Sequence, residues 1–382
     1  MRKDRIPTFL LITALAVGCS DGSNEPEPIM SPLFAKGGAA ACPTPADYIV
    51  NDESSLLGAL HVVSPGEVIG LDGFFGVTAD VFLLTDDVTL TCASAGSGLY
   101  AVANAGVFYV LEVLAADVTV EHLVLDGFNA LGPLWAQNNG VSTFAQGLRL
   151  ANNRVTCGTS VCAFLVGVAD ATIVDNDFES LQPLTTGVHI QGQGAEFDQC
   201  SRDRPTDGTV VRRNTITTTD PSTSFGGIRL RDGTNVVIEQ NAVLGPWSNS
   251  IHASRICDSE IEKNKLEGAV WDGLLMWTDA YDNVIRNNKM TGAGEAGVLA
   301  GFACGNLFLG NNLNSNAQWG AFFLPETGNN TLVGDKNVVV DDGDWDCDGD
   351  GEVDPNIITG RVKSGVPLGR IISAAISSGK MN

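Results

Sequence analysis

An acidic segment near the C-terminal end has the spacing of a cation-binding loop. Its carboxylates occupy alternate positions: Asp346, Asp348, Asp350, Glu352 and Asp354. Carboxylate oxygens at alternate positions can surround a hard cation, and Gly351 permits the sharp turn between them. Ile357 stands where an EF-hand loop has its bidentate glutamate. We therefore predict a structural calcium site in residues 341–356, with a merely solvated acidic turn as the alternative.

A second group of residues that could take part in catalysis consists of histidines and arginines. They lie in three similar segments, 187–191, 227–232 and 250–254. Arginine could hold the carboxylate of a uronate sugar and stabilise the charge that develops beside it. Histidine could remove the neighbouring proton as a general base, which gives β-elimination or epimerisation. The candidate catalytic residues are His189, Arg229, His252, Arg231 and Asp232.

Two other interpretations of these residues stay open. A glycoside hydrolase would need two carboxylates at a defined separation, for which Asp232 and Asp279 are the candidates. We expect a lyase or an epimerase rather than a hydrolase if the chain is an enzyme. The simplest alternative is that these side chains are ordinary solvated strand residues.

Four tryptophans could provide stacking surfaces for sugar rings: Trp247, Trp271, Trp277 and Trp319. Sugars present apolar C–H faces to which an aromatic ring can bind. Three of the four precede the start of a predicted strand, on the margin of the same face. The alternative is that they only cover corners of the fold.

The elements that position these residues follow from a repeat. An apolar residue, two variable residues, an asparagine, one variable residue and a second apolar residue recur with most steps at 23 or 24 residues. The recurring asparagines are Asn153, Asn176, Asn214, Asn241, Asn264, Asn288 and Asn311. This period fits one coil of a parallel β-solenoid. Asparagines stacked at one bend can hydrogen-bond from coil to coil, about 4.8 Å apart.

A second column of residues confirms the register of the repeat. A glycine, serine or cysteine lies 14 or 15 residues before most of these repeat positions, and each starts a segment that alternates between apolar and variable side chains. Alternation with a period of two indicates strands with one buried face. The inward residues are then Val188, Ile190, Ile228, Leu230, Ile251, Ala253, Leu274, Met276, Val298, Ala300, Ala321 and Phe323. The outward column runs Phe164, His189, Arg229, His252, Leu275, Leu299 and Phe322.

These repeats predict an all-β fold, a single-stranded right-handed parallel β-helix over residues 45–340. A short helix over residues 54–63 is expected to cap the first coil and cover its open edge. The chain resembles the pectate-lyase-like superfamily of exported bacterial β-helices, on the strength of the repeat pattern. The resemblance implies frequent action on polysaccharides, although the superfamily also contains non-catalytic surface proteins.

The two ends of the chain lie outside the repeat. Residues 1–18 have a basic start and an apolar run too short to span a membrane, which is typical of an export signal. Residues 16–19 resemble a bacterial lipobox, which implies lipidation at Cys19; an ordinary cleaved signal is the alternative. Residues 19–44 are expected to be a disordered tether, and residues 357–382 a C-terminal cap or tail with a short helix. The expected location is the bacterial cell envelope, at the outer membrane.

Composition excludes some partners. The net charge is −23, so nucleic acid is not expected as a partner, because phosphate binding needs a basic face. Nine cysteines less Cys19 leave eight, and an even count in an exported chain favours disulfides; Cys157 with Cys162 is the obvious local pair. With four histidines and no methionine clusters, a metal-handling role is disfavoured.

Two functional hypotheses follow. In the first, the protein is a monomeric β-helix lipoprotein of the cell envelope that binds or processes a polysaccharide or cell-surface glycan, with membrane contact through the lipid anchor alone. In the second, it is a non-catalytic surface scaffold, similar to an adhesin. Convergence of the histidine, arginine and tryptophan side chains on one face would favour the first hypothesis.

Overall fold

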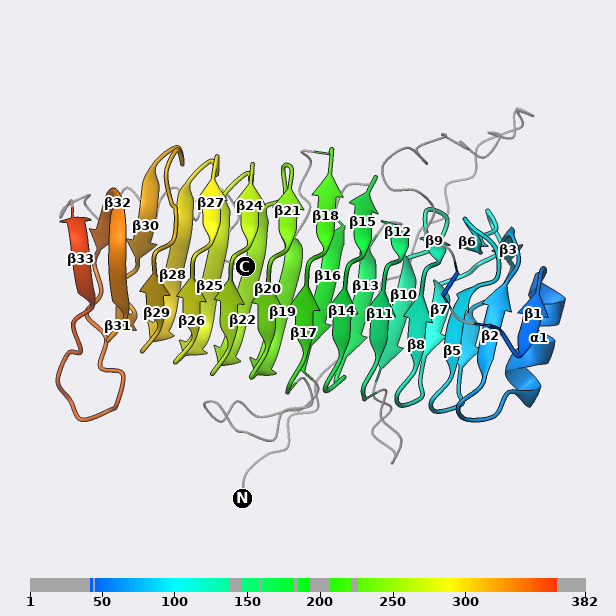
Figure 1. The fold of residues 1–382 in the computed structure, drawn as a ribbon. Helices are drawn as coiled ribbons and strands as arrows, with labels where there is room; N and C mark the ends of the chain where they lie inside the picture. Colours follow the sequence, from blue (N-terminus) through cyan, green and yellow to red (C-terminus); the bar gives the residue numbers. More distant parts are fainter. Residues whose placement is uncertain are drawn as a thin grey trace, which may run out of the picture. The chain divides into compact units, whose positions relative to one another are not determined.

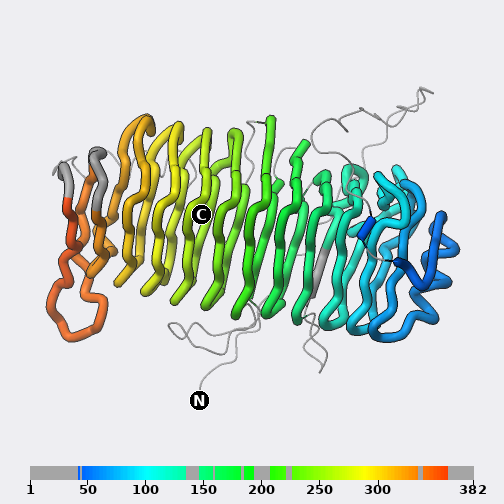
Figure 2. Tube along the Cα trace, in the orientation of Figure 1, coloured from blue at the N-terminus to red at the C-terminus, as the bar shows by residue number. Residues whose placement is uncertain are grey.

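The computed structural model describes residues 42–43, 45–137, 146–157, 160–181, 185–192, 207–220 and 226–362. From β1 to β33 the chain winds into a stack of coils in sequence order, from blue to red in Figure 1, and Figure 2 traces the same path. The pairings between the strands of neighbouring coils are parallel. The predicted single-stranded parallel β-helix is confirmed.

A complete coil has three strands, which we call first, second and third. First strands carry the outward column of histidines and arginines: β4 (Val81–Leu83), β7 (Tyr109–Val113), β10 (Gly132–Gln137), β13 (Val161–Val166), β16 (Thr186–Gln191), β19 (Gly226–Thr234), β22 (Asn249–Cys257), β25 (Asp272–Tyr281), β28 (Ala296–Cys304), β30 (Trp319–Phe323) and the short β31 (Thr327–Gly328).

Second strands precede the asparagine bend: β1 (Tyr48–Val50), β2 (Val68–Leu71), β5 (Thr89–Cys92), β8 (Thr119–Glu121), β11 (Arg149–Ala151), β14 (Thr172–Val174), β17 (Val210–Arg212), β20 (Val237–Glu239), β23 (Glu260–Glu262), β26 (Val284–Arg286), β29 (Leu307–Leu309), β32 (Thr331–Asp341) and β33 (Ile357–Val362). Third strands form a separate sheet: β3 (Phe74–Val77), β6 (Gly98–Ala101), β9 (Val124–Asp126), β12 (Arg154–Cys157), β15 (Asp177–Ser180), β18 (Thr215–Thr218), β21 (Ala242–Leu244), β24 (Lys265–Glu267) and β27 (Lys289–Thr291).

The core consists of apolar columns in which each residue lies on its counterpart in the next coil. On the second strands, Ile173 pairs with Val211 and Val211 with Ile238, and all three are fully buried. On the first strands, every predicted inward residue from Val188 to Phe323 is buried. Burial of apolar surface along these columns drives the stacking of coils.

The predicted asparagine ladder is present at the bend between second and third strands. The side-chain amide of each asparagine donates to the side-chain oxygen of the next, from Asn153 through to Asn311, at 3.0 Å per step. The same amide also donates to a backbone carbonyl; the amide of Asn264, for example, donates to the carbonyl of Ile238. These buried polar groups are therefore satisfied within the ladder.

A second ladder, which the sequence analysis missed, lies at the bend between first and second strands. Asn283 Nδ2 donates to Asn306 Oδ1 at 2.8 Å, Asn306 to Asn330 at 2.9 Å, and Asn330 to Asn356 at 2.9 Å. Ser259 occupies the preceding position and donates its backbone N–H to Asn283. This ladder supports only the later coils of the described stack.

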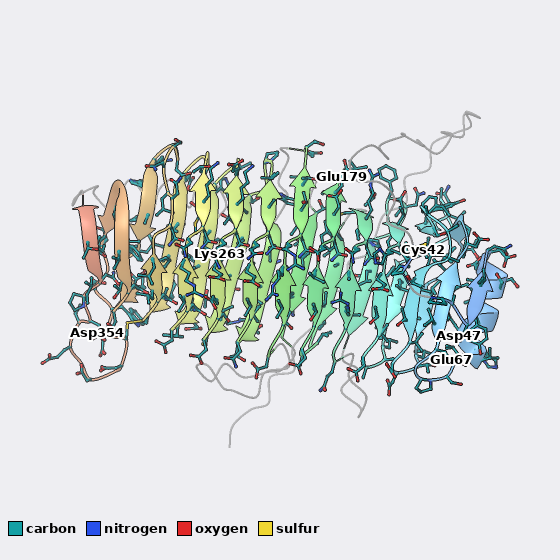
Figure 3. All side chains as sticks on the ribbon, in the orientation of Figure 1. Cys42, Asp47, Glu67, Glu179, Lys263 and Asp354 are labelled. Carbon is teal, nitrogen blue, oxygen red and sulfur yellow. A yellow bond between two sulfur atoms is a disulfide. The ribbon has the colours of Figure 1, made fainter. Side chains whose placement is uncertain are left out.

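The N-terminal end is capped as predicted, by α1 (Glu53–Val62). Asp52 and Ser55 form a capping box at its start, and Leu56 and Ala59 are buried against the first coils. Asp47 and Glu67 lie at this end of the stack and Asp354 at the other (Figure 3). No helix in the described residues is long and apolar enough to cross a membrane.

Disulfides reinforce both ends and the middle of the stack. Cys42 is bonded to Cys92 at the first coils, and Cys304 to Cys347 at the last. The predicted local pair Cys157 and Cys162 is bonded, and Cys257 also takes part in a disulfide. Past the acidic segment, β33 pairs with β32, so the predicted cap or tail begins as one more strand. The predicted signal, Cys19, nearly all of the tether and the predicted C-terminal helix lie outside the described residues.

Candidate functional site

The first strands bring three of the predicted catalytic residues into one outward column. His189 in β16 lies opposite Arg229 in β19, and Arg229 lies opposite His252 in β22. Adjacent coils are separated by about 4.8 Å, so the three side chains are neighbours on one face. Gln191, Arg231 and Ser254 form the next outward column in the same register. We call these six residues the His/Arg face.

Both histidines of the His/Arg face are held in the neutral form. Burial, assisted by the charges of Arg229 and Arg231, lowers the pKa of His189 to about 3 and that of His252 to about 4. The ring of His189 stacks on Phe164 with centroids 4.7 Å apart, and its Nε2 is enclosed without a hydrogen-bond partner in the described residues. The ring nitrogens of His252 are not enclosed in this way.

Arg229 is a cation without an ion pair among the described residues. Its Nε is buried and has no hydrogen-bond partner within that part of the chain. Burial and the nearby Arg231 lower the pKa of Arg229, but an arginine remains charged at neutral pH. A half-buried guanidinium between two neutral imidazoles is suited to an anionic ligand, because a carboxylate could satisfy its unpaired donors.

Asp232 forms an ion pair with an arginine of the next coil. Arg255 donates to both of its carboxylate oxygens, at 2.5 and 2.7 Å, and Arg231 approaches it at 3.5 Å. Asp279, the other carboxylate considered for hydrolysis, accepts a hydrogen bond from the Tyr281 hydroxyl. Neither residue therefore presents an unengaged carboxylate next to Arg229.

The four predicted stacking tryptophans separate into different environments. Trp247 has no exposed surface, and its indole N–H donates to the carbonyl of Leu244, so it offers no face to a sugar. Trp271 and Trp319 are partly exposed at the other margin of the first strands, where Trp319 packs on Phe322. Trp277 lies in the same column as Arg231 and Ser254. Of the four, Trp277 shares an outward column with a predicted catalytic residue, Arg231.

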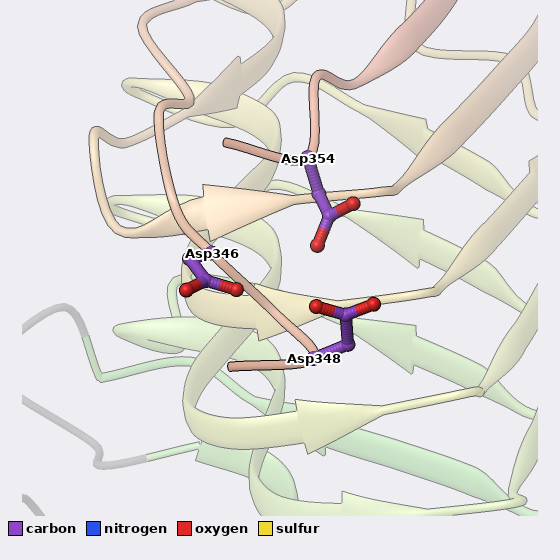
Figure 4. A group of neighbouring side chains, drawn as sticks. All are labelled: Asp346, Asp348 and Asp354. Carbon is purple, nitrogen blue, oxygen red and sulfur yellow. The ribbon is translucent and has the colours of Figure 1, made fainter. Parts of the chain in front are cut away.

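The acidic segment brings together three of its five predicted ligands. Carboxylate oxygens of Asp346, Asp348 and Asp354 lie within 4.8 Å of one another and turn toward a common centre (Figure 4). Backbone N–H groups of Gly349 and Gly351 donate to the two oxygens of Asp346 at 2.7 and 2.8 Å. Oxygen donors in this arrangement fit a hard cation such as calcium. Asp350 and Glu352 are outside the group.

A carboxyl pair that was not predicted from the sequence lies on the N-terminal part of the same outward column. Glu112 in β7 lies opposite Phe82 and is only 6% exposed. Burial, with the charge and hydrogen bond of Asp80, raises the pKa of Glu112 to about 7. Asp80 in turn accepts the backbone N–H of Phe108 at 2.7 Å. The alternation of β7 could have indicated that Glu112 faces outward, but not that Asp80 meets it.

Comparison with known families settles the fold class. The family model described as right-handed beta helix region matches residues 139–337. The chain belongs to this right-handed β-helix family. No curated protein matches the sequence of this β-helix protein.

Several solved structures are similar in fold to this β-helix protein. The A-module of the Azotobacter vinelandii mannuronan C-5 epimerase AlgE4 has a TM-score of 0.56 and 14% identity over 85% of this chain and 96% of that chain. The AlgE6 A-module from the same organism has a TM-score of 0.46 and 16% identity over 84% and 97%. The tailspike of Escherichia coli bacteriophage HK620 has a TM-score of 0.49 and 8% identity over 84% and 73%. These likenesses concern the fold.

Proposed function

We propose that the protein binds an acidic polysaccharide on the His/Arg face and changes a uronate residue there by β-elimination or epimerisation. The observation that carries this proposal is Arg229, a half-buried cation that lies between two neutral histidines and has no ion pair among the described residues. The fold shared with a mannuronan C-5 epimerase supports the proposal, because that enzyme acts on uronates.

Arg229 binds the uronate carboxylate and stabilises the negative charge that develops there when the C5 proton leaves. His252 is the base that removes this proton, since, unlike Nε2 of His189, neither of its ring nitrogens is a fully buried atom without a partner in the described residues. In elimination, the electron pair of the C–H bond forms the C4–C5 double bond, and the C4 oxygen departs with the proton that His252 has taken up. In epimerisation, C5 instead takes up a proton from water on the opposite face, and His252 releases its proton to water. His189, stacked on Phe164, positions Arg229.

The low pKa of His252 suits this role once substrate is bound. In the free protein, burial and the two arginines disfavour the protonated imidazole. A carboxylate on Arg229 would offset that positive charge and raise the pKa of His252 in the complex. The imidazole is therefore neutral before binding and more basic after it.

The first experiment measures exchange of the C5 hydrogen with water, followed as release of tritium from substrate labelled at C5, because both elimination and epimerisation release this hydrogen. Uronate-containing polysaccharides labelled with tritium at C5 are incubated with the protein and calcium, and the tritium that appears in the water is counted. Ultraviolet absorbance of unsaturated products then separates elimination from epimerisation. We expect exchange with the wild type and its loss, by at least a hundredfold, in His252→Gln and Arg229→Ala.

Matched variants test whether the loss is specific. His61→Gln changes a histidine of α1, and Arg154→Ala removes an arginine of the third strand β12, paired with Glu179. Both should keep wild-type exchange. If a uronate polysaccharide binds in a manner that depends on Arg229 but shows no exchange, the protein is a binding module. If there is neither binding nor exchange, the result favours the non-catalytic surface scaffold.

The acidic segment supplies a second proposal, that calcium bound by Asp346, Asp348 and Asp354 holds the last coils in place. Cys347 lies within this segment and is bonded to Cys304 in β28, so a cation here would fix the segment against the stack. Isothermal titration with calcium should show binding to the wild type. Asp348→Asn should weaken it, whereas Asp258→Asn, at an exposed bend, should not.

The location of the protein is also a proposal. Lipidation at Cys19 would anchor the solenoid to the outer membrane through residues 19–44. Labelling with a radioactive fatty acid should mark the wild type and not Cys19→Ser, and membrane fractionation should release that variant. Labelling of neither form would favour the ordinary cleaved signal.

A further inference from the structure

We propose that the polysaccharide recognised here is a heteropolymer in which an acidic sugar is flanked by uncharged sugars, and that Trp277, Phe302 and Trp345 bind the uncharged ones. This inference rests on the proposed function and specifies its substrate class. It follows from what lies beside the His/Arg face on the described first strands.

Three aromatic side chains form a continuous strip beyond His252. The rings of Trp277 and Phe302 meet edge to face, with centroids 5.8 Å apart, and those of Phe302 and Trp345 likewise at 6.2 Å. Phe302 is 36% exposed and Trp345 41% exposed. A side chain at Gly301 would collide with the indole of Trp277, within 2.7 Å, so glycine makes room for the ring.

The backbone at Phe302 indicates that the exposed ring has a use. Phe302 has a φ of 53°, in the left-handed region that bulky residues avoid. Equivalent corners in earlier coils use Asp232 and Arg255, which form an ion pair with each other. Asparagine or glycine would adopt this conformation at lower cost, so an exposed phenylalanine here is unfavourable both for the backbone and for hydration.

The aromatic strip begins close to the His/Arg face and on the same surface of the first strands. Trp277 follows Ser254 and Arg231 in one outward column, two coils beyond Arg231. Aromatic rings bind the C–H faces of sugars without requiring charge. A glycan whose acidic residue contacts Arg229, and which extends toward the later coils, would place its next residues over this strip.

The charges beside the strip disfavour a polymer that is acidic at every residue. Past His252 the first outward column continues as Leu275, Leu299 and Phe322, and it offers no cation. Further along lie Asp341, Asp342 and Asp344, and burial together with the other two carboxylates raises the pKa of Asp342. Carboxylates of a homopolyuronate would be desolvated on the apolar column and repelled by these aspartates. Uncharged sugars meet neither penalty.

Equilibrium binding of the full chain to two classes of oligosaccharide tests the inference. The heteropolymer probe is a gellan-type oligosaccharide, with glucuronate between glucose residues, and the homopolymer probes are oligomannuronate and oligogalacturonate of equal length. We expect the gellan-type probe to bind at least tenfold more tightly. Phe302→Asn should weaken its binding about tenfold and leave the weaker binding of the homopolymers unchanged.

Phe302→Asn suits the left-handed backbone, so its thermal midpoint should be unchanged or higher, which separates lost binding from misfolding. Phe128→Asn makes the same change at an exposed phenylalanine in the turn after β9 and should keep wild-type binding. Equal or tighter binding of the homopolymers, or unchanged gellan-type binding in Phe302→Asn, would overturn the inference and leave the proposed function standing. If neither class binds, the proposed function itself fails.

Discussion

Arg255 donates two hydrogen bonds to the carboxylate of Asp232, which lies in the preceding coil at the corner beside Arg231. Their side chains are only 13% and 17% exposed, so the pair is shielded from water. Asp232 was predicted from sequence as a catalytic residue, and the structure shows it bound to an arginine. The two interpretations predict different consequences of its removal.

Asp232→Ala should destabilise the fold by about 3 kcal/mol, because the largely buried guanidinium of Arg255 loses both of its hydrogen bonds to Asp232. The double variant Asp232→Ala/Arg255→Ala should recover much of this loss. Chemical denaturation of the single and double variants measures the coupling. A stable Asp232→Ala protein that has lost C5 proton exchange would instead restore Asp232 as a catalytic residue.

Asn264→Ala should destabilise the stack by about 3 kcal/mol, since it removes the oxygen that accepts from the side-chain amide and the backbone N–H of Asn241, and the donor to the carbonyl of Ile238, in a buried ladder. Thermal and denaturant unfolding measure the loss. The matched variant Asn314→Ala removes an exposed asparagine after the ladder and should change stability by less than about 0.5 kcal/mol. Equal effects of the two substitutions would contradict a structural role of the ladder.

Glu112 predicts a dependence of stability on pH. Its pKa is raised to about 7 in the folded protein, above its ordinary value near 4.5, so the folded state prefers the protonated form. The stability that this group contributes is complete below about pH 4.5 and is lost as the pH rises through 7. Glu112→Gln should therefore flatten the stability profile between pH 5 and 8. An unchanged profile, measured by denaturant unfolding at each pH, would show that the Asp80 pair does not hold a proton.

Calcium removal should loosen the end of the stack and not its middle. A chelator should lower the thermal midpoint of the wild type and increase proteolysis within residues 341–356, while Asp348→Asn should respond little to the chelator. Cleavage that is the same with and without chelator would argue for a solvated acidic turn. Magnesium in place of calcium serves as the control for ionic strength.

The solenoid could be predicted from sequence because its asparagines and inward apolar residues recur at nearly constant spacing. The second ladder was missed because Val236 and Ser259 occupy its first positions, so asparagine recurs only from Asn283 onward. The asparagine repeat does not extend to the early coils either. Ile69, Leu90 and Val120 stack there, but unequal steps in the sequence separate them.

The site was predicted in part, because strand alternation gives the direction of a side chain but not its partner. The column of His189, Arg229 and His252 follows from alternation alone. The engagement of Asp232 by Arg255 does not, since both residues adopt left-handed backbone at a corner where alternation ends. Trp247 was predicted at the surface but is buried in the core. It precedes its strand, where alternation does not give the direction of a side chain.

The first asparagine ladder begins where the backbone N–H of Leu123 donates to Asn153, and earlier coils lie outside it. Local opening in a solenoid involves mainly a coil and its immediate neighbours. Amide protons of the coils before Leu123 should consequently exchange with solvent sooner than those between Asn153 and Asn356. The His/Arg face lies wholly in the slowly exchanging part, so fraying at the α1 end would leave its geometry intact.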